Sequence, residues 1–336
     1  MSNQTLLETI DPEVVETLVS RRDAIRKGAS VSALAAAGLA AGSIPLALAA
    51  LASDAHAQQT GPAADIITVL KFAYLLENIE AEFYKTVLGK GTNFSATNNP
   101  QAAAFAPVRA TFTETEAAAI DLIRVHEEAH VALLKATLAG APFNFTAPTF
   151  TGADFDFTGG SGSGTGPFAA ATTNKAFLLV ATQGFEDTGV RAYKGQVGNL
   201  MSNTKILETA LRIHSVEARH ASKIRRMRRA SAANGSNAIV RWSGTIRGGG
   251  AGAAGATDVG TPSTEVAAAL QAIYAGEDNT THGGLNITSL TGLTSPGGIP
   301  SGDVANALTE AFDEPLTKPQ VVAIVTPFVK DSKGLV

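Results

Sequence analysis

The chain has 336 residues, no cysteine and a formal net charge of −4. The lack of cysteine excludes disulfides, iron–sulfur clusters and a thiolate-bound iron domain of the rubredoxin type. The weakly acidic balance argues against nucleic acid as a partner, because binding to nucleic acid depends on neutralising phosphates with Lys and Arg.

The first 57 residues are predicted to be an export signal. Arg21 and Arg22 form a twin-arginine pair, residues 28–53 carry no charge and are rich in Ala, Leu and Gly, and residues 55–57 read Ala-His-Ala, a cleavage pattern. The leader before the arginines is long and acidic, so a retained membrane anchor is the alternative. We expect a periplasmic or secreted protein, with membrane contact only if the signal is retained.

Residues 58–231 are predicted to form an all-α four-helix bundle. Apolar residues recur there with the helical period, and Gly or Pro follows the ends of the segments. The expected helices span residues 63–88, 107–138, 169–197 and 202–230, with Ser202 as the cap of the last. Residues 141–167 are rich in Phe, Thr and Gly, and they are long enough to cross from one helical hairpin to the other.

Residues 232–336 form a Gly-rich C-terminal extension. Its Gly-rich stretches alternate with short segments of helical pattern at residues 263–274, 302–312 and 318–329. Such a segment lacks a large apolar core of its own. We therefore expect it to pack on the bundle instead of forming an independent domain.

One short pattern occurs twice in the bundle: a Glu with a Tyr seven positions later, followed downstream by Glu-x-x-His. The two copies are Glu77, Tyr84, Glu127 and His130, and then Glu186, Tyr193, Glu217 and His220. Helix positions three apart project from one face, and in each segment this face is also the apolar one. Each of the four helices therefore directs a carboxylate toward the core.

Four buried carboxylates need a counter-charge. Burying one unpaired carboxylate costs several kcal/mol, and these helix faces contain no Lys or Arg to neutralise it. Two divalent ions would balance four carboxylates, and each imidazole adds a nitrogen ligand. The pattern thus predicts two metal ions, iron or manganese, because both accept these ligands. A hydrogen-bonded polar core without metal is the alternative.

Five further polar residues are expected to surround the ligands without being primary ligands themselves: Glu80, Tyr84, His126, Tyr193 and His214. Glu80 faces the ligand stripe, but the second copy has Gly189 at its position, which favours a role in hydrogen bonding or in a solvent path. His126 and His214 favour hydrogen bonding to a ligand, or simple packing. The two tyrosines could be hydrogen-bond or radical sites, although buried Tyr in a bundle is usually structural.

Four segments together resemble the ferritin-like superfamily, specifically exported bacterial ferritin-like domain proteins related to desiccation-associated proteins. The segments are residues 75–84 (LLENIEAEFY), 124–130 (RVHEEAH), 184–193 (GFEDTGVRAY) and 214–220 (HSVEARH). The resemblance implies a ferritin-like bundle with Glu77 and Glu186 as terminal ligands, Glu127 and Glu217 as bridging carboxylates, and His130 and His220 as one imidazole per ion. It identifies the site more securely than the reaction.

The expected function is that of a di-metal oxidoreductase outside the cytoplasm. Ferrous iron, dioxygen or peroxide would be its substrates, by a ferroxidase or peroxidase reaction or by a manganese catalase-like one. No catalytic residue beyond the metal ligands is predicted. The alternative is a stress-related or desiccation-related protein that sequesters metal, or only supports structure, without turnover. Homo-oligomerisation stays open.

Overall fold

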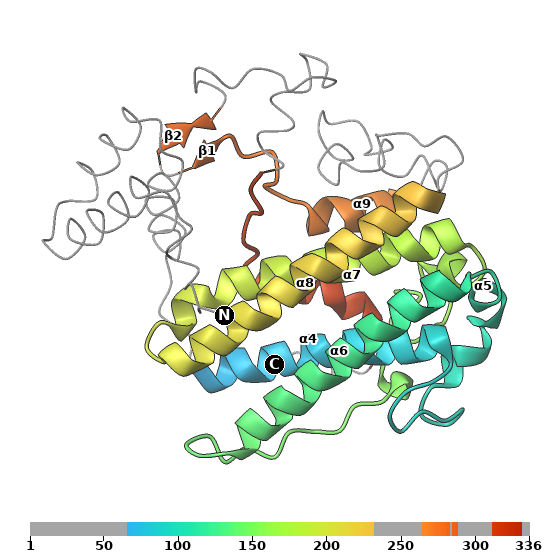
Figure 1. Ribbon diagram of the computed structural model, residues 1–336, viewed down its shortest axis with the longest axis horizontal. Coiled ribbons are helices and arrows are strands. Elements are labelled where there is room, and N and C mark those ends of the chain that lie inside the picture. Colours follow the sequence, from blue (N-terminus) through green and yellow to red (C-terminus); the bar gives the residue numbers. More distant parts are fainter. Residues whose placement is uncertain (1–65, 232–263, 283, 288–310, 331–336) are drawn as a thin grey trace, which may run out of the picture. The chain divides into compact units, whose positions relative to one another are not determined.

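The computed structural model describes residues 66–231, 264–282, 284–287 and 311–330. Its main helices are α4 (Ile66–Leu88), α6 (Glu114–Ala139), α7 (Lys175–Leu200) and α8 (Thr204–Ser231). They form a bundle in which α4 pairs with α6 and α7 with α8 (Figure 1). This confirms the predicted all-α four-helix bundle with its long crossover. The predicted export signal lies outside the described residues.

The second predicted helix, residues 107–138, is wrong at its start. A short helix, α5 (Ala106–Arg109), precedes a break, and α6 begins only at Glu114. Thr113 makes this break a true helix start, because its hydroxyl accepts from the Glu116 N–H at 3.2 Å and its own N–H donates to the Glu116 carboxylate at 2.8 Å. Such a reciprocal capping box satisfies two amide donors at a helix N-terminus.

The third and fourth helices also begin later than predicted. A 3₁₀ turn, η4 (Ala169–Thr172), precedes α7, and the side chain of Asn174 then caps it by accepting from Phe177 N–H at 3.0 Å. Ser202 is not the cap of α8, since Asn203 Oδ1 accepts from Ile206 N–H at 3.2 Å. Asn and Asp satisfy the first free amides of a helix as well as Ser does.

The crossover is ordered by one buried carboxylate. The Asp156 side chain accepts from the backbone N–H groups of Thr158, Gly162 and Gly164 at 2.9–3.0 Å. Three amide donors compensate a charge that burial would otherwise destabilise. Residues 141–167 contain only a short 3₁₀ turn, η3 (Gly152–Asp154), as their lack of helical pattern predicted.

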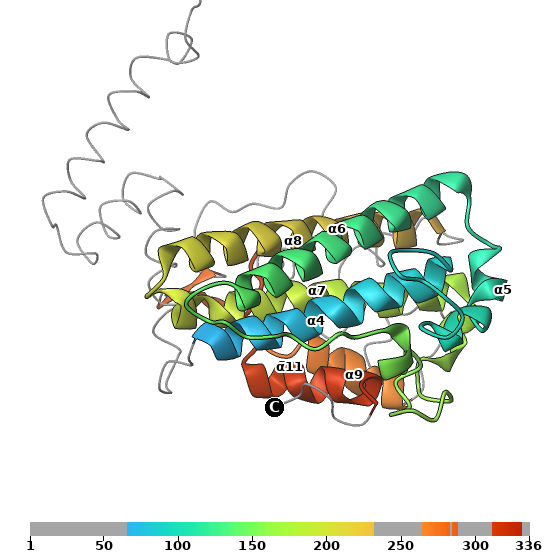
Figure 2. The ribbon, with the colours of Figure 1, turned by 90° about the horizontal axis from the view of Figure 1, so that it is seen from below.

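Part of the C-terminal extension packs on α7. It comprises α9 (Thr264–Ile273), α11 (Lys318–Val325) and the 3₁₀ turn η9 (Thr326–Phe328), which lie on the α4 and α7 side of the bundle, away from α6 and α8 (Figure 2). Arg191 in α7 donates to the backbone carbonyls of Ile273, Ala275 and Glu314. The predicted helix at residues 302–312 falls almost entirely outside the described residues.

The described residues also include one small sheet. Strands β1 (Thr281–His282) and β2 (Leu285–Asn286) pair to form a two-stranded sheet. Among the described helices, none has the length and apolar character needed to cross a membrane.

Candidate metal centre

All six predicted ligands point into the bundle, each near the middle of its helix. Glu77 lies in α4, Glu127 and His130 in α6, Glu186 in α7, and Glu217 and His220 in α8. The four carboxylates are fully buried at 0% exposure, and the two imidazoles are also buried. The inward face predicted from helical periodicity is therefore the face that the fold buries.

The six side chains form two overlapping groups. In each group, four side chains place one ligand atom within 4.8 Å of the others: Glu77, Glu127, His130 and Glu217, and then Glu127, Glu186, Glu217 and His220. Glu127 and Glu217 belong to both groups. A pair of carboxylates shared in this way is the arrangement expected of ligands that bridge two ions.

Glu127 faces both imidazoles directly. Its Oε2 is 3.0 Å from His130 Nδ1, and its Oε1 is 2.7 Å from His220 Nδ1. The same Nδ1 of His130 lies 3.0 Å from Glu77 Oε2, and that of His220 lies 3.2 Å from Glu186 Oε2. His130 Nδ1 also lies 3.4 Å from Glu217 Oε1, so each imidazole nitrogen faces at least one shared carboxylate together with the Glu that belongs to its group alone.

Several ligand atoms are buried without a hydrogen bond to any described residue. They are Glu127 Oε1, Glu186 Oε2, both carboxylate oxygens of Glu217, and His220 Nδ1. Glu127 Oε1 and His220 Nδ1 are close to each other, but their angles are not those of a hydrogen bond. Buried polar atoms rarely lack partners. Carboxylate oxygens and imidazole nitrogens that converge in this way fit a divalent cation.

Electrostatics lead to the same conclusion. Burial raises the pKa of Glu127 and of Glu217 well above its usual value, and the neighbouring carboxylates raise both further. The neighbouring carboxylates therefore make ionisation of Glu127 and of Glu217 less favourable. A cation among them would reverse this effect by stabilising the ionised forms.

The two tyrosines cross between the copies of the motif. Tyr193 in α7 donates to Glu77 Oε1 in α4 at 2.5 Å, and Tyr84 in α4 donates to Glu186 Oε1 in α7. Glu77 and Glu186 are therefore each oriented by the tyrosine of the opposite copy. Spacing within one helix cannot predict this exchange, because it identifies only neighbours on the same helix.

Glu80 and Gly189 form a complementary pair. A methyl group added at Gly189 would come within 2.6 Å of Glu217 Oε2 and 3.2 Å of Glu80 Oε1. The glycine in α7 therefore leaves the space that these two carboxylates occupy. Glu80 is buried and belongs to neither ligand group, and its role beside the ligands stays a prediction.

The two remaining histidines differ in their surroundings. His126 Nδ1 lies 2.9 Å from His220 Nε2, within hydrogen-bond distance, so that the opposite nitrogen of His220 faces the carboxylates. His214 belongs to neither group, and both burial and the charge of Lys194 lower its pKa. His126 thus contacts a predicted ligand, as expected for a residue that orients it.

Residues 65–230 match the ferritin-like domain family. The bundle is a ferritin-like domain. The match runs from the start of α4 to the end of α8 and so includes all six predicted ligands. Comparisons with the curated proteins and with the solved structures give no significant match. The export signal and the relation to desiccation-associated proteins stay predictions.

Proposed function

We propose that the carboxylate cluster binds two divalent metal ions, iron or manganese, and that the protein is an oxidoreductase acting on ferrous iron, dioxygen or peroxide. The main support is the sharing of Glu127 and Glu217 between two buried groups of ligand atoms. The bound ions would supply the one-electron steps that dioxygen and peroxide chemistry requires and that amino-acid side chains supply poorly.

The six residues would divide their roles between the two ions. Glu77 and His130 would bind one ion, Glu186 and His220 the other, and Glu127 and Glu217 both. This assignment follows the two groups of ligand atoms. Six protein ligands do not saturate two octahedral ions, so positions would remain for a small oxygen-containing substrate.

The surrounding residues would position the ligands and exclude water. Tyr84 and Tyr193 each orient one terminal carboxylate through a hydrogen bond across the bundle. The ring of Phe83 is surrounded by those of Tyr84, Phe157 and Phe185, whose centroids lie 4.9–5.5 Å from its own. A water-poor surrounding of this kind strengthens the attraction between carboxylates and cations.

Oxygen measurements test the proposed activity. Protein purified from its native host is given ferrous iron in air, or hydrogen peroxide, while an oxygen electrode records the concentration of dioxygen. We expect oxygen consumption with ferrous iron for an iron oxidase, and oxygen release with peroxide for a manganese catalase-like enzyme. The proposal is contradicted by metal-loaded protein that gives neither signal above the rate of Glu217→Ala protein and that, without air, oxidises ferrous iron with peroxide no faster than this variant.

Metal sequestration without turnover is the second candidate. The complete burial of the four carboxylates favours it, because a buried site retains its ions well. In that case the protein would keep its metal through dialysis against a weak chelator and would process neither dioxygen nor peroxide.

We also propose that the protein works outside the cytoplasm, which Arg21 and Arg22 and the uncharged stretch after them support. Twin-arginine export transports folded proteins, which suits a bundle that acquires its metals before export. Replacing both arginines by lysine should leave the protein in the cytoplasmic fraction. Export of this variant at the normal level would contradict the proposal.

A further inference from the structure

The outer side of α6 is apolar along most of its length. One row of exposed residues, spaced alternately four and three positions apart, runs along a single side of this helix. The row consists of Ala118, Leu122, Val125, Ala129, Ala132 and Ala136. A helix side that faces water is normally polar, so this row has the composition of a surface that another apolar surface covers.

The large apolar side chains that the described residues leave exposed are confined to the same part of the bundle. Each of them is 44–57% exposed. They are Leu122, Val125 and Leu133 in α6, Leu211 in α8 and Met201 in the turn that joins α7 to α8. Single exposed apolar residues need no explanation, but a group of them marks a contact with a protein or a membrane.

The outer side of α8 is basic. Four exposed basic residues follow one another there at intervals of seven positions, which is about two helical turns. They are Lys205, Arg212, Arg219 and Arg226. Of the two acidic residues in α8, Glu217 is fully buried and Glu208 lies 2.5 Å from the guanidinium of Arg212. The outer side of α8 therefore keeps a positive charge.

The apolar row of α6 and the basic row of α8 together form one surface, which we call the α6–α8 face. The two helices pack side by side, with His126 Nδ1 2.9 Å from His220 Nε2, and both lie on the side of the bundle away from α11 (Figure 2). The half-buried carboxylates of Asp121 and Glu128 in α6 both accept from Arg124. They are therefore neutralised within α6 and offset little of the charge on α8.

We propose that the α6–α8 face binds the surface of a membrane that contains anionic phospholipids. Such a surface offers both kinds of contact that the face needs. Apolar side chains enter the boundary between headgroups and acyl chains, and Lys and Arg are attracted by the anionic headgroups. The contact uses only α6 and α8, so it depends neither on retention of the predicted export signal nor on the metal chemistry proposed above.

Other occupants fit the face less well. A second copy of the chain would present the same surface, and the exposed carboxylates of α6 and α8 available to its basic row are only Glu114 and Glu208. Protein partners bind mainly through aromatic and Arg anchors that fill pockets, and the apolar row contains no aromatic residue. Nucleic acid would satisfy the basic row but would leave Leu122, Val125 and Leu133 in water.

Vesicle sedimentation tests the proposal. Protein purified from its native host is mixed with vesicles of phosphatidylglycerol and phosphatidylcholine, or of phosphatidylcholine alone, and the bound fraction is measured after centrifugation. We expect binding to the anionic vesicles that weakens at high salt, and little binding to phosphatidylcholine alone, because salt screens the charges of the basic row. A protein that does not bind the anionic vesicles at low salt overturns the proposal.

Neutralising the basic row should remove most of this binding. Lys205→Gln, Arg212→Gln and Arg226→Gln combined should weaken it about 100-fold, since each charge near an anionic surface contributes roughly a factor of five. A matched control changes the net charge equally in α4, in α11 and after η9, and it should bind almost as the wild type does. This control combines Lys71→Gln, Lys318→Gln and Lys330→Gln. Equal losses in the two triple variants would overturn the proposal, because net charge alone would then explain the binding.

The apolar row is tested by Leu122→Gln and Leu133→Gln combined. Both side chains are exposed and Gln is a good helix former, so this variant should keep the wild-type melting temperature. We expect it to bind the anionic vesicles about tenfold more weakly. Unchanged binding, together with equally strong binding of soluble poly-glutamate, would indicate an acidic protein partner and overturn the membrane proposal.

Discussion

The α4–α6 hairpin and the α7–α8 hairpin contribute the same ligands but differ around them. Each hairpin supplies two Glu, one His and one Tyr at matching positions, and each Tyr bonds to the terminal Glu of the other hairpin. The residues next to this set do not repeat. Glu80 in α4 corresponds to Gly189 in α7, and His126 in α6 to Val216 in α8.

A third difference concerns what covers each hairpin. Glu82 in α4 pairs with Lys85 at 2.6 Å and accepts from Asn99 at 2.9 Å, whereas Arg191 at the equivalent position of α7 binds backbone carbonyls of the C-terminal extension. Each group of four ligand atoms draws residues from both hairpins. The ligand residues therefore have to be the same in the two hairpins. Residues that only support one hairpin are free to diverge.

The largest expected effect on metal content comes from removing a carboxylate that both groups of ligand atoms share. Glu127→Ala or Glu217→Ala removes a carboxylate that belongs to both groups, so we expect loss of most metal from both positions. Elemental analysis of the purified variants measures this as metal per chain. Glu80→Ala is the control and should keep most of the metal. Equal losses in all three variants would show that the ligand assignment is wrong.

The Gly189→Ala variant tests the divergent position in α7. The added methyl group would lie 2.6 Å from Glu217 Oε2, so the carboxylate must move, and we expect metal affinity to fall by about 10- to 100-fold. Gly184→Ala in the same helix is the matched control, because its methyl group would meet only the flexible end of Ile273, at 3.1 Å. Competition with a chelator measures both affinities. Similar affinities in the two variants would refute the packing argument.

Replacing either tyrosine by Phe tests the symmetry of the hydrogen bonds across the bundle. Tyr84→Phe and Tyr193→Phe each remove one bond to a buried carboxylate, which is worth about 1.5–3 kcal/mol. We expect similar decreases in the free energy of unfolding of the metal-loaded protein, measured with a chemical denaturant. A large decrease in one variant and none in the other would mean that the two bonds are not equivalent.

The last expected effect concerns the contact of the extension with α7. Burial raises the pKa of Glu277 to about 8, although Arg191, 2.9 Å away, lowers it. Between its usual value of about 4.5 and 8, the folded protein keeps a proton that the unfolded chain has lost. Glu277 therefore contributes stability that is fully present below pH 4.5 and is lost as the pH rises through 8.

Glu277→Gln should remove this part of the pH dependence. We expect the free energy of unfolding to fall less steeply between pH 5 and 8 in the variant than in the wild type. Denaturant titrations at several pH values measure both slopes. Identical slopes would show that Glu277 stays ionised in the folded protein, held so by Arg191.

The helices and their inward faces were predicted mainly from helical periodicity. It placed Glu127 with His130, and Glu217 with His220, on inward faces, and the structure buries all four. It says less about single residues at the edge of an apolar stripe, since Leu211, three positions before His214 in α8, is 44% exposed. Periodicity describes one helix at a time and leaves the neighbouring helix unknown.

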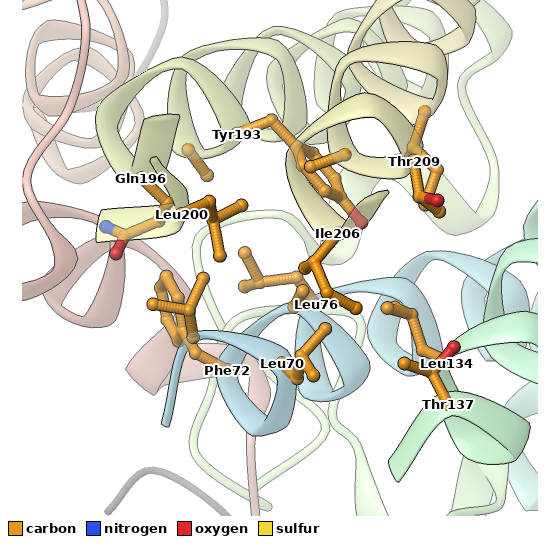
Figure 3. Close-up of a pocket in the computed structure, with 15 residues that line it drawn as sticks. Leu70, Phe72, Leu76, Leu134, Thr137, Tyr193, Gln196, Leu200, Ile206 and Thr209 are labelled. Atoms are coloured by element: carbon orange, nitrogen blue, oxygen red, sulfur yellow. The ribbon is translucent and has the colours of Figure 1, made fainter. Parts of the chain in front are cut away.

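Contacts between side chains of different helices could not be predicted from the sequence. Neither the exchange of Tyr84 and Tyr193 nor the contact between His126 and His220 follows from spacing along the chain. The start of α6, in contrast, could have been predicted from the sequence, because Thr113 and Glu116 have the spacing of a capping box. The apolar hollow lined by Leu70, Leu134 and Tyr193 depends on packing among four helices, which no local pattern specifies (Figure 3).

The central claim is that two divalent cations neutralise the buried carboxylates of the two hairpins. Elemental analysis of the protein purified from its native host, combined with its melting temperature before and after treatment with a chelator, tests this claim most directly. We expect about two iron or manganese ions per chain and a lower melting temperature once they are removed. Protein without metal whose melting temperature does not change with added iron or manganese would contradict it.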